Sequence, residues 1–191
     1  MKTIICNNCV GAEIYRMLGC QFDNPFMWNL IEFDSYAKLI EEFDTLDLSD
    51  ISTRVVKDDA YGKDRHSVVL TVAGHIEIPF IHHHWSETAR TPMRSGRELY
   101  YSDIQALVKD NWNRRMQRMS DDILFIYINR ERPEFNQRFA ELKTAHRKLL
   151  VTKFRNISSN ECGFPVMYGI GKGPIFLMAE RILTEHKDLI V

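Results

Sequence analysis

The stretch from Thr3 to Gly19, TIICNNCVGAEIYRMLG, joins an apolar strand pattern directly to a polar turn and an amphipathic helix. Asn7, Asn8 and Cys9 sit at the junction. In α/β proteins a ligand often binds where a strand's carboxyl end meets the next helix's amino end, because free N–H groups and the helix dipole converge there. This stretch therefore predicts an α/β fold and directs the search for a site to the turn.

Strand-like and helix-like patterns alternate along the rest of the chain. Helices are predicted at 36–43, 102–119, 134–146 and 175–186, and strands at 52–56, 67–72, 76–85, 123–129 and 148–154. The order strand, helix, strand over 123–154 is typical of a parallel sheet. Pro79 cannot donate to a sheet ladder, so its strand is expected at an edge or to contain a bulge.

These patterns predict one compact α/β domain over residues 1–191. Its sheet is expected to be mixed and mostly parallel, with helices on both faces and an edge hairpin turned at Ala73-Gly74-His75. The segment 156–174 is rich in Ser, Asn, Gly and Pro. It is either a binding loop or lid, or an ordinary irregular connection.

Composition narrows the classes of function. The chain has 191 residues, 45% of them apolar, and a formal net charge of -1, so it predicts one core and gives no reason to expect nucleic acid as a partner. Its four cysteines lack the second CxxC pair of a zinc ribbon. No signal-peptide pattern and no apolar run of about 20 residues is present. We expect a cytoplasmic protein without a membrane span; composition names no cofactor.

The polar turn supports several interpretations. Asn7 or Asn8 caps the helix, or the asparagine side chains hydrogen-bond a polar ligand. Cys9 fills a small apolar gap, or it is a nucleophile whose thiolate the helix dipole stabilises. Glu13 complements the dipole, or it serves as a general base. Asn7 and Asn8 are therefore candidate ligand contacts, and Cys9 and Glu13 are candidate catalytic groups.

Three consecutive histidines, His82, His83 and His84, end the predicted edge strand. Because side chains alternate along a strand, His82 and His84 would share a face and could bind zinc or iron with a third ligand. The sequence identifies no third ligand, so no metal is predicted. Without a metal, the histidines are either exposed polar residues or include a general acid or base. His82 is the candidate for that role.

The helix carrying WNRRMQRM places an arginine on an apolar stripe. At about 100° per residue the stripe contains Ile104, Val108, Trp112 and Met119. Arg115 projects within the stripe and Arg118 lies at its border, and an unpaired buried guanidinium is very costly. Arg115, with Arg118, either forms an internal ion pair or grips a phosphate or carboxylate, with Trp112 as a neighbouring ligand contact. The second interpretation predicts that Asn7, Asn8 and Arg115 face one cleft.

Four blocks of the chain resemble a known bacterial family, domain of unknown function 1919. They are IICNNCVGAEIYRMLG, HIEIPFIHH, WNRRMQRM and DDILFIYIN, in the same order as in the family. The family's Asn-Asn-Cys-x-Gly turn is matched by Asn7, Asn8, Cys9 and Gly11, which implies that Gly11 belongs to the ligand site. Members often carry the label of exopolysaccharide or capsule biosynthesis, so the resemblance implies a role near surface-sugar assembly. The chain departs from the family at Gly74-His75, where Gly-Asp is usual, and at Pro79.

Two functions from different classes fit these observations. The first is a transferase acting on a sugar or sugar phosphate in surface polysaccharide biosynthesis. In such a transferase the polar turn would orient the substrate, and Arg115 and Arg118 would hold its phosphate. His82 or Glu13 would act as the general acid or base. No DxD-like metal motif is present, since Asp58-Asp59 and Asp121-Asp122 are adjacent pairs. The second is a non-catalytic sugar- or nucleotide-binding or assembly protein, which needs the same pocket and no reactive group.

Overall fold

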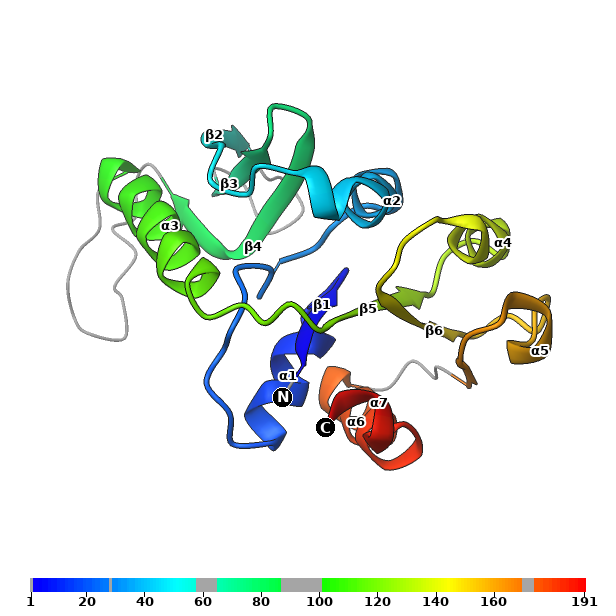
Figure 1. The fold of residues 1–191 in the computed structure, drawn as a ribbon. Helices are drawn as coiled ribbons and strands as arrows, with labels where there is room; N and C mark the ends of the chain where they lie inside the picture. The colour runs from blue at the N-terminus through cyan, green and yellow to red at the C-terminus, as the bar shows by residue number, and fades with distance from the viewer. Residues whose placement is uncertain (1, 28, 58–64, 87–100, 170–173) are drawn as a thin grey trace.

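The strands of the molecule form two sheets (Figure 1). The computed structural model describes residues 2–27, 29–57, 65–86, 101–169 and 174–191, and only the backbone of residues 57, 65–67, 80–86 and 101–105. A parallel sheet in the order β1-β5-β6-β7 contains β1 (Thr3–Cys6), β5 (Ile123–Asn129), β6 (Arg147–Thr152) and β7 (Val166–Tyr168). An antiparallel sheet in the order β2-β3-β4 contains β2 (Ile51–Lys57), β3 (Arg65–Val72) and β4 (Ile76–Ser86).

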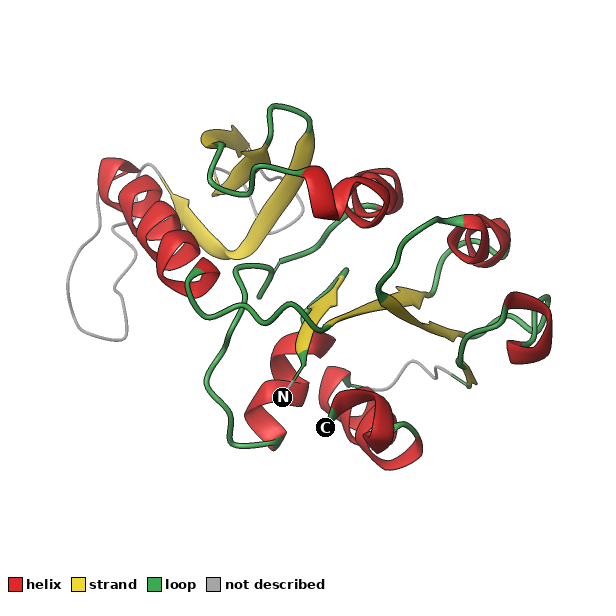
Figure 2. Cartoon of the chain, viewed as in Figure 1, coloured by secondary structure: helices red, strands yellow, loops and turns green. Residues whose placement is uncertain are grey.

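Helices connect and cover these strands (Figure 2). They are α1 (Val10–Met17), α2 (Phe33–Glu42), the 3-10 turn η1 (Phe43–Thr45), α3 (Tyr101–Met116), α4 (Glu134–Glu141), α5 (Ser159–Cys162), α6 (Ile175–Glu185) and α7 (Lys187–Ile190). In Figure 1, α1 and α6 lie on one face of the parallel sheet, and α2 and α4 on the other. In this view the antiparallel sheet lies beside α2, and α3 lies on the other side of β4 from α2.

Alternation along β5 builds the core on both faces of the parallel sheet. Phe125 and Tyr127 belong to the buried cluster that includes α2 and α4. Leu124 and Ile126 belong to the cluster that includes α1 and α6. All seven residues of β5 are buried, which is why its sequence is a continuous apolar run rather than an alternating one. The two clusters fix both helical layers to this central strand.

The predicted fold class is confirmed: the chain is an α/β protein with a parallel sheet and helices on both faces. The expected edge position of the Pro79 strand is also confirmed, because β4 borders only β3 in the described sheet. The register shifts between His66 and Val68, which pair with Trp85 and Phe80 respectively. The hairpin β3–β4 belongs to the separate antiparallel sheet, together with β2, rather than to an edge of the parallel sheet.

Two segments differ in detail from the sequence pattern. The helix expected at 134–146 ends at Glu141, where the Lys148 ammonium donates to the carbonyls of Phe139, Ala140 and Leu142 at 2.9–3.1 Å. A lysine from the next strand thus satisfies the last free carbonyls of α4. Within the expected loop at 156–174, α5 begins with a capping box at Ser158, and β7 adds a fourth parallel strand.

Candidate functional site

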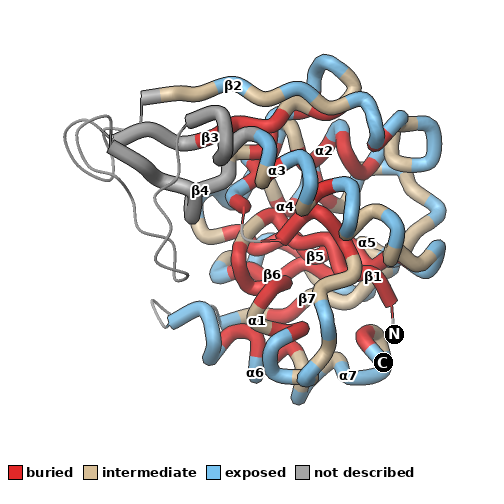
Figure 3. The backbone as a smooth tube through the Cα atoms, turned by 90° about the vertical axis from the view of Figure 1, so that its left-hand side faces the viewer, coloured by how far each residue is buried: buried red, intermediate tan, exposed pale blue. Residues whose placement is uncertain are grey.

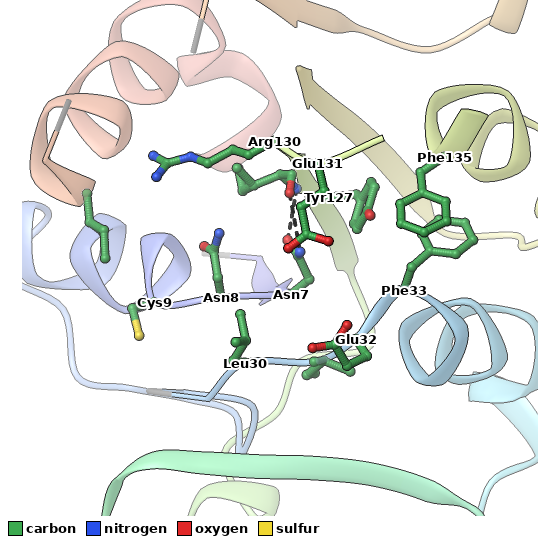
Figure 4. A pocket seen from close by; sticks show the side chains of 13 residues that line it. Asn7, Asn8, Cys9, Leu30, Glu32, Phe33, Tyr127, Arg130, Glu131 and Phe135 are labelled. Atoms are coloured by element: carbon green, nitrogen blue, oxygen red, sulfur yellow. Dashed lines mark hydrogen bonds between the residues drawn. The ribbon is translucent and has the colours of Figure 1, made fainter. Parts of the chain in front are cut away.

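A cavity of about 240 Å³ lies at the carboxyl ends of β1 and β5 (Figure 4). It is lined by Asn7, Asn8, Cys9, Leu30, Ile31, Glu32, Phe33, Tyr127, Ile128, Arg130, Glu131, Phe135 and Ile175. Three loops therefore form it: the turn after β1, the segment before α2, and the loop from β5 to α4. This is the edge of a parallel sheet where ligands of α/β proteins commonly bind.

Asn7 uses its side chain to extend the pairing of β1 with β5. Its Oδ1 accepts a hydrogen bond from the Ile128 N–H at 2.8 Å, and its Nδ2 donates to the Ile128 carbonyl at 3.4 Å. The Asn7 amide thus takes the place of one more backbone pair in the ladder. Asn7 lines the cavity, and both of its polar groups are engaged by the protein.

Asn8, one residue before the N-cap Cys9, bonds to the first N–H group of α1 and leaves a donor facing the cavity. Its Oδ1 accepts the Val10 N–H at 3.0 Å, which satisfies one of the free donors at the start of the helix. Figure 4 shows the Asn8 amide directed toward Arg130. Within the described residues no acceptor is recorded for Asn8 Nδ2. This N–H group is therefore available to a ligand.

Arg130 brings an unpaired positive charge to the same side of the cavity. No described carboxylate lies within ion-pairing distance of Arg130, and its buried Nε has no hydrogen-bond partner among the described residues. Its Nη2 lies 3.9 Å from the Met178 sulfur, in the first turns of α6. The amino end of a helix carries the positive pole of its dipole, so a guanidinium there is electrostatically unfavourable unless an anion joins it.

A chain of side-chain amides holds the loop that carries Arg130. Asn129 Nδ2 donates to Asn136 Oδ1 at 2.6 Å, and Asn136 Nδ2 donates to Asn156 Oδ1 at 2.6 Å. Asn129 Oδ1 also accepts the backbone N–H groups of Glu131 and Arg132. The chain therefore connects the end of β5, the start of α4 and the loop after β6, and it fixes the backbone on either side of the cavity-lining residues.

Aromatic rings and carboxylates form the opposite side of the cavity. The rings of Phe33 and Phe135 stack with centroids 4.4 Å apart, and Phe33 meets Tyr127 edge to face at 5.1 Å. Burial, followed by the negative charges of Glu131 and Glu32, raises the pKa of Tyr127, so its hydroxyl remains protonated at neutral pH. Figure 4 shows these rings across the cavity from Asn8 and Arg130. The cavity thus has a cationic side and an aromatic side.

Cys9 lines the cavity, but its environment favours the thiol over the thiolate. Burial, with a smaller contribution from the Glu13 charge, raises the pKa of Cys9 to about 11. This direction is opposite to the one that the helix dipole alone would give. Glu13 is not among the lining residues and accepts a hydrogen bond from Arg16 Nε at 2.6 Å. The ion-pair and dipole interpretation therefore fits Glu13 better than the general-base interpretation.

Gly11 and Trp112 are packing residues rather than lining residues. A Cβ atom on Gly11 would lie 2.9 Å from the Cys6 Cβ, so glycine is what allows α1 to approach β1 this closely. Trp112 is 1% exposed, packs edge to face on Phe26 at 5.1 Å, and donates from Nε1 to the Leu48 carbonyl at 2.8 Å. Neither residue lines this cavity, although both were expected in a ligand site.

The prediction that Arg115 faces the same cleft as Asn7 and Asn8 is wrong. Neither Arg115 nor Arg118 lines the cavity, and the Arg115 guanidinium lies 5.5 Å from the centre of the Phe22 ring. The reason is topological: α3 ends just before β5 begins, so its last turn lies near the amino edge of the parallel sheet. The Ser120 N–H accordingly donates to Thr3 Oγ1, at the start of β1, at 2.8 Å. The cavity is at the carboxyl edge.

The three histidines fall where only the backbone is described. His82, His83 and His84 lie in β4, and their side chains are outside the described part of the structure. Since Val68 pairs with Phe80 and His66 with Trp85, the simple alternation expected along this strand is interrupted there. Among the described residues, no group of three His, Cys, Asp or Glu side chains could hold a metal ion.

The sequence interpretation missed the second half of the cavity. Glu32, Phe33, Arg130, Glu131 and Phe135 all line it, yet none was singled out. The sequence did carry a signal for them, because the polar segment RERPEF directly follows the most apolar strand of the chain, as NNC follows β1. The strand-end rule applied to both strands would have directed attention to Arg130 and Glu131.

The fold and cavity place this chain among α/β proteins with a pocket at the carboxyl edge of a parallel sheet. The family described as Domain of unknown function (DUF1919) matches residues 1–98, and the chain belongs to that family. The match includes the turn after β1 and the segment before α2, but it stops before β5. No curated protein matches the chain. In the ranges that the structure describes, no helix has the length and apolar character needed to cross a membrane.

Proposed function

We propose that the protein binds a sugar phosphate in this cavity and acts on it as a cytoplasmic transferase in surface polysaccharide biosynthesis. The observation that carries the proposal is the position of Arg130, which has no described carboxylate partner and shares the cavity with an aromatic wall. The polysaccharide context rests on the family resemblance. The ligand class rests on the two chemically different sides of the cavity.

The cationic side suits a phosphate group. A guanidinium donates two parallel hydrogen bonds to phosphate oxygens, and such charge-assisted bonds are among the strongest in proteins. The free Asn8 Nδ2 adds a third donor, and the start of α1, at Val10, adds the positive pole of a helix dipole. A phosphate here would also satisfy the buried Nε of Arg130.

The aromatic side suits a sugar. Phe33, Tyr127 and Phe135 line the cavity with apolar ring atoms, against which the C–H groups of a pyranose can pack. Glu32 and Glu131 offer carboxylate acceptors for its hydroxyl groups. A volume of about 240 Å³ lies below the range of about 300–1000 Å³ usual for drug-sized ligands. One monosaccharide phosphate therefore fits the cavity better than a dinucleotide.

Group transfer from such a ligand needs a base and a leaving group. An acceptor hydroxyl oxygen attacks the sugar carbon that bears the phosphate, and the carbon–oxygen bond to phosphate breaks. Phosphate leaves with the bonding electron pair and remains paired with Arg130, while a carboxylate takes the proton of the hydroxyl. Glu131 and Glu32 are exposed carboxylates at this cavity, and they replace Glu13 and Cys9 as the candidates for that base.

A specific observation also favours a second function, a sugar-phosphate-binding protein without turnover. The thiol at the cavity, Cys9, is protonated at neutral pH, and Glu13 is paired with Arg16. Neither of the reactive groups expected from the opening stretch is therefore poised for chemistry. The two functions share one binding site and differ in whether Glu131 or Glu32 moves a proton.

Calorimetric titration with glucose 1-phosphate, glucose and inorganic phosphate tests the shared site. We expect glucose 1-phosphate to bind more tightly than either part. Arg130→Gln should weaken its binding by about ten- to a hundredfold, the value of a hydrogen bond to a charged group. Arg114→Gln, which removes an exposed arginine of α3, is the matched control. If no phosphorylated sugar binds, or if both variants bind it alike, the proposal is wrong.

Phosphate release followed by ³¹P NMR then separates the two functions. With an acceptor sugar present, a transferase releases phosphate, and Glu131→Gln or Glu32→Gln should retain binding but lose turnover. Binding without release for the wild type, over a panel of sugar acceptors, would instead support the binding protein. The NMR measurement therefore tests turnover alone, because the calorimetric titration tests binding separately.

A further inference from the structure

Exposed apolar side chains lie at the cavity and in the helical turn next to it. Among the described residues the exposed large apolar side chains are Met17, Leu30, Ile175, Phe176, Leu177 and Val191. Leu30 and Ile175 line the cavity, and Phe176 and Leu177 follow Ile175 in the first turn of α6. Figure 3 shows the amino end of α6 as exposed. Single exposed apolar residues are ordinary, but two that line a cavity, with two more in the same helical turn, mark a candidate binding surface.

Packing of α6 on the sheet does not require this apolar turn. The helix buries Met178, Ala179 and Ile182, which form one stripe. Successive residues of a helix are rotated by about 100°, so Ile175, Phe176 and Leu177 spread apolar surface around most of the first turn. They are 39%, 46% and 44% exposed. The turn therefore offers an apolar surface beyond the stripe that the fold uses.

The same turn lies against the unpaired cation. Arg130 Nη2 is 3.9 Å from the Met178 sulfur, one residue beyond Leu177. The apolar turn and the positive charge therefore meet beside one cavity, which Arg130 and Ile175 both line. A ligand that matches both has an anionic head group and an apolar chain attached to it.

We propose that the ligand of this cavity is a lipid-linked phosphate, whose apolar chain lies over Leu30 and the first turn of α6. The proposal rests on the proposed function, because it takes the phosphate at Arg130 as given. The head group occupies the space between Arg130 and the aromatic wall. The chain leaves through the mouth between Leu30 and Ile175 and covers Phe176 and Leu177.

Alkyl phosphates of increasing chain length test this inference. We compare methyl, hexyl and dodecyl phosphate by calorimetric titration, below the concentration at which each forms micelles. A fully buried methylene contributes roughly fourfold in affinity, so even a partly covered chain should improve binding at least tenfold from methyl to dodecyl phosphate. In the double variant Phe176→Ser, Leu177→Ser this ratio should fall below threefold.

Met17→Ser is the matched control. Met17 is 37% exposed and is the last residue of α1, at the end opposite the cavity, so this variant should keep the wild-type ratio. Circular dichroism melting of each variant shows that it is folded. Equal affinities for methyl and dodecyl phosphate would overturn this inference and leave the proposed function standing.

Two further outcomes also overturn it. If neither alkyl phosphate nor glucose 1-phosphate binds, the proposed function fails and this inference fails with it. If the double variant keeps the chain-length dependence but changes the oligomeric state in sedimentation, the apolar turn is a protein interface. The lipid-linked ligand is then excluded from this surface.

Discussion

A missing side chain at Gly11 lets helix α1 lie directly on β1. A Cβ atom at this position would be 2.9 Å from the Cys6 Cβ, closer than two carbon atoms approach without strain. Gly11→Ala should therefore destabilise the protein by about 1–3 kcal/mol, the usual cost of overpacking, despite the better helix propensity of alanine. Urea unfolding measures the change. The turn at Asn7 and Asn8 depends on the same packing, so the variant should also bind sugar phosphate more weakly.

The double variant Gly11→Ala, Cys6→Gly checks the cause. Removing the Cys6 Cβ removes the close contact, so the two changes should be strongly non-additive, with a coupling of about 0.5–3 kcal/mol. Strict additivity would show that the loss comes from somewhere other than this contact.

Cys9 allows a prediction about reactivity with pH. Because burial raises its pKa to about 11, only about one Cys9 in ten thousand is a thiolate at pH 7. In a variant that keeps Cys9 alone, alkylation by iodoacetamide should be slow at pH 7 and rise about tenfold per pH unit up to pH 10. A plateau below pH 8 would mean a stabilised thiolate and would restore Cys9 as a nucleophile. Cys9→Ser should leave turnover unchanged.

Among the elements, α2 is fixed to the carboxyl edge of the sheet by one hydroxyl group. Tyr36 is fully buried, and its Oη lies 2.8 Å from the Ile5 carbonyl and 2.9 Å from the Ile126 carbonyl. Tyr36→Phe removes this donor, while the Ile126 carbonyl keeps the Asn7 N–H at 3.3 Å, and the change should cost about 0.5–1.5 kcal/mol in unfolding free energy, the net value of a hydrogen bond. Tyr127→Phe is the matched control, since no hydrogen bond of its hydroxyl is recorded within the described part. Equal losses in the two variants would contradict the role of Tyr36.

The sequence predicts elements well where the signal is local. The β1 turn and helix, the β5 strand and the edge position of Pro79 follow from apolar periodicity and proline chemistry alone. The end of α4 does not, because Lys148 from the next strand determines it. Arg115 was misplaced because a helical wheel shows which side chains share a stripe, but not which element that stripe contacts. The division into two sheets depends on strand pairing, which periodicity does not encode.

At the scale of the whole molecule, the family match and the folded unit have different extents. Residues 1–98 contain the matched region, but in the described sheet β1 pairs only with β5, at residues 123–129. Ile4 and Ile5 of β1 are 0% exposed, and the two core clusters that contain them include residues of β5 and β6, and, on the Ile4 side, of α6. The cavity is likewise completed by the loop after β5 and by Ile175. Half of the site thus lies outside the matched region.

A fragment ending at residue 98 should therefore be unfolded. A chain of this length is long enough to form a small domain. The fragment is therefore expected to be unfolded because it lacks β5 and α6, and not because it is short. We expect no cooperative urea transition by circular dichroism for the fragment, and one transition, coincident by fluorescence and circular dichroism, for residues 1–191. The single transition follows because the buried clusters on both faces of the parallel sheet contain residues from each half of the chain. A fragment that unfolds cooperatively would instead show that residues 1–98 form a domain of their own.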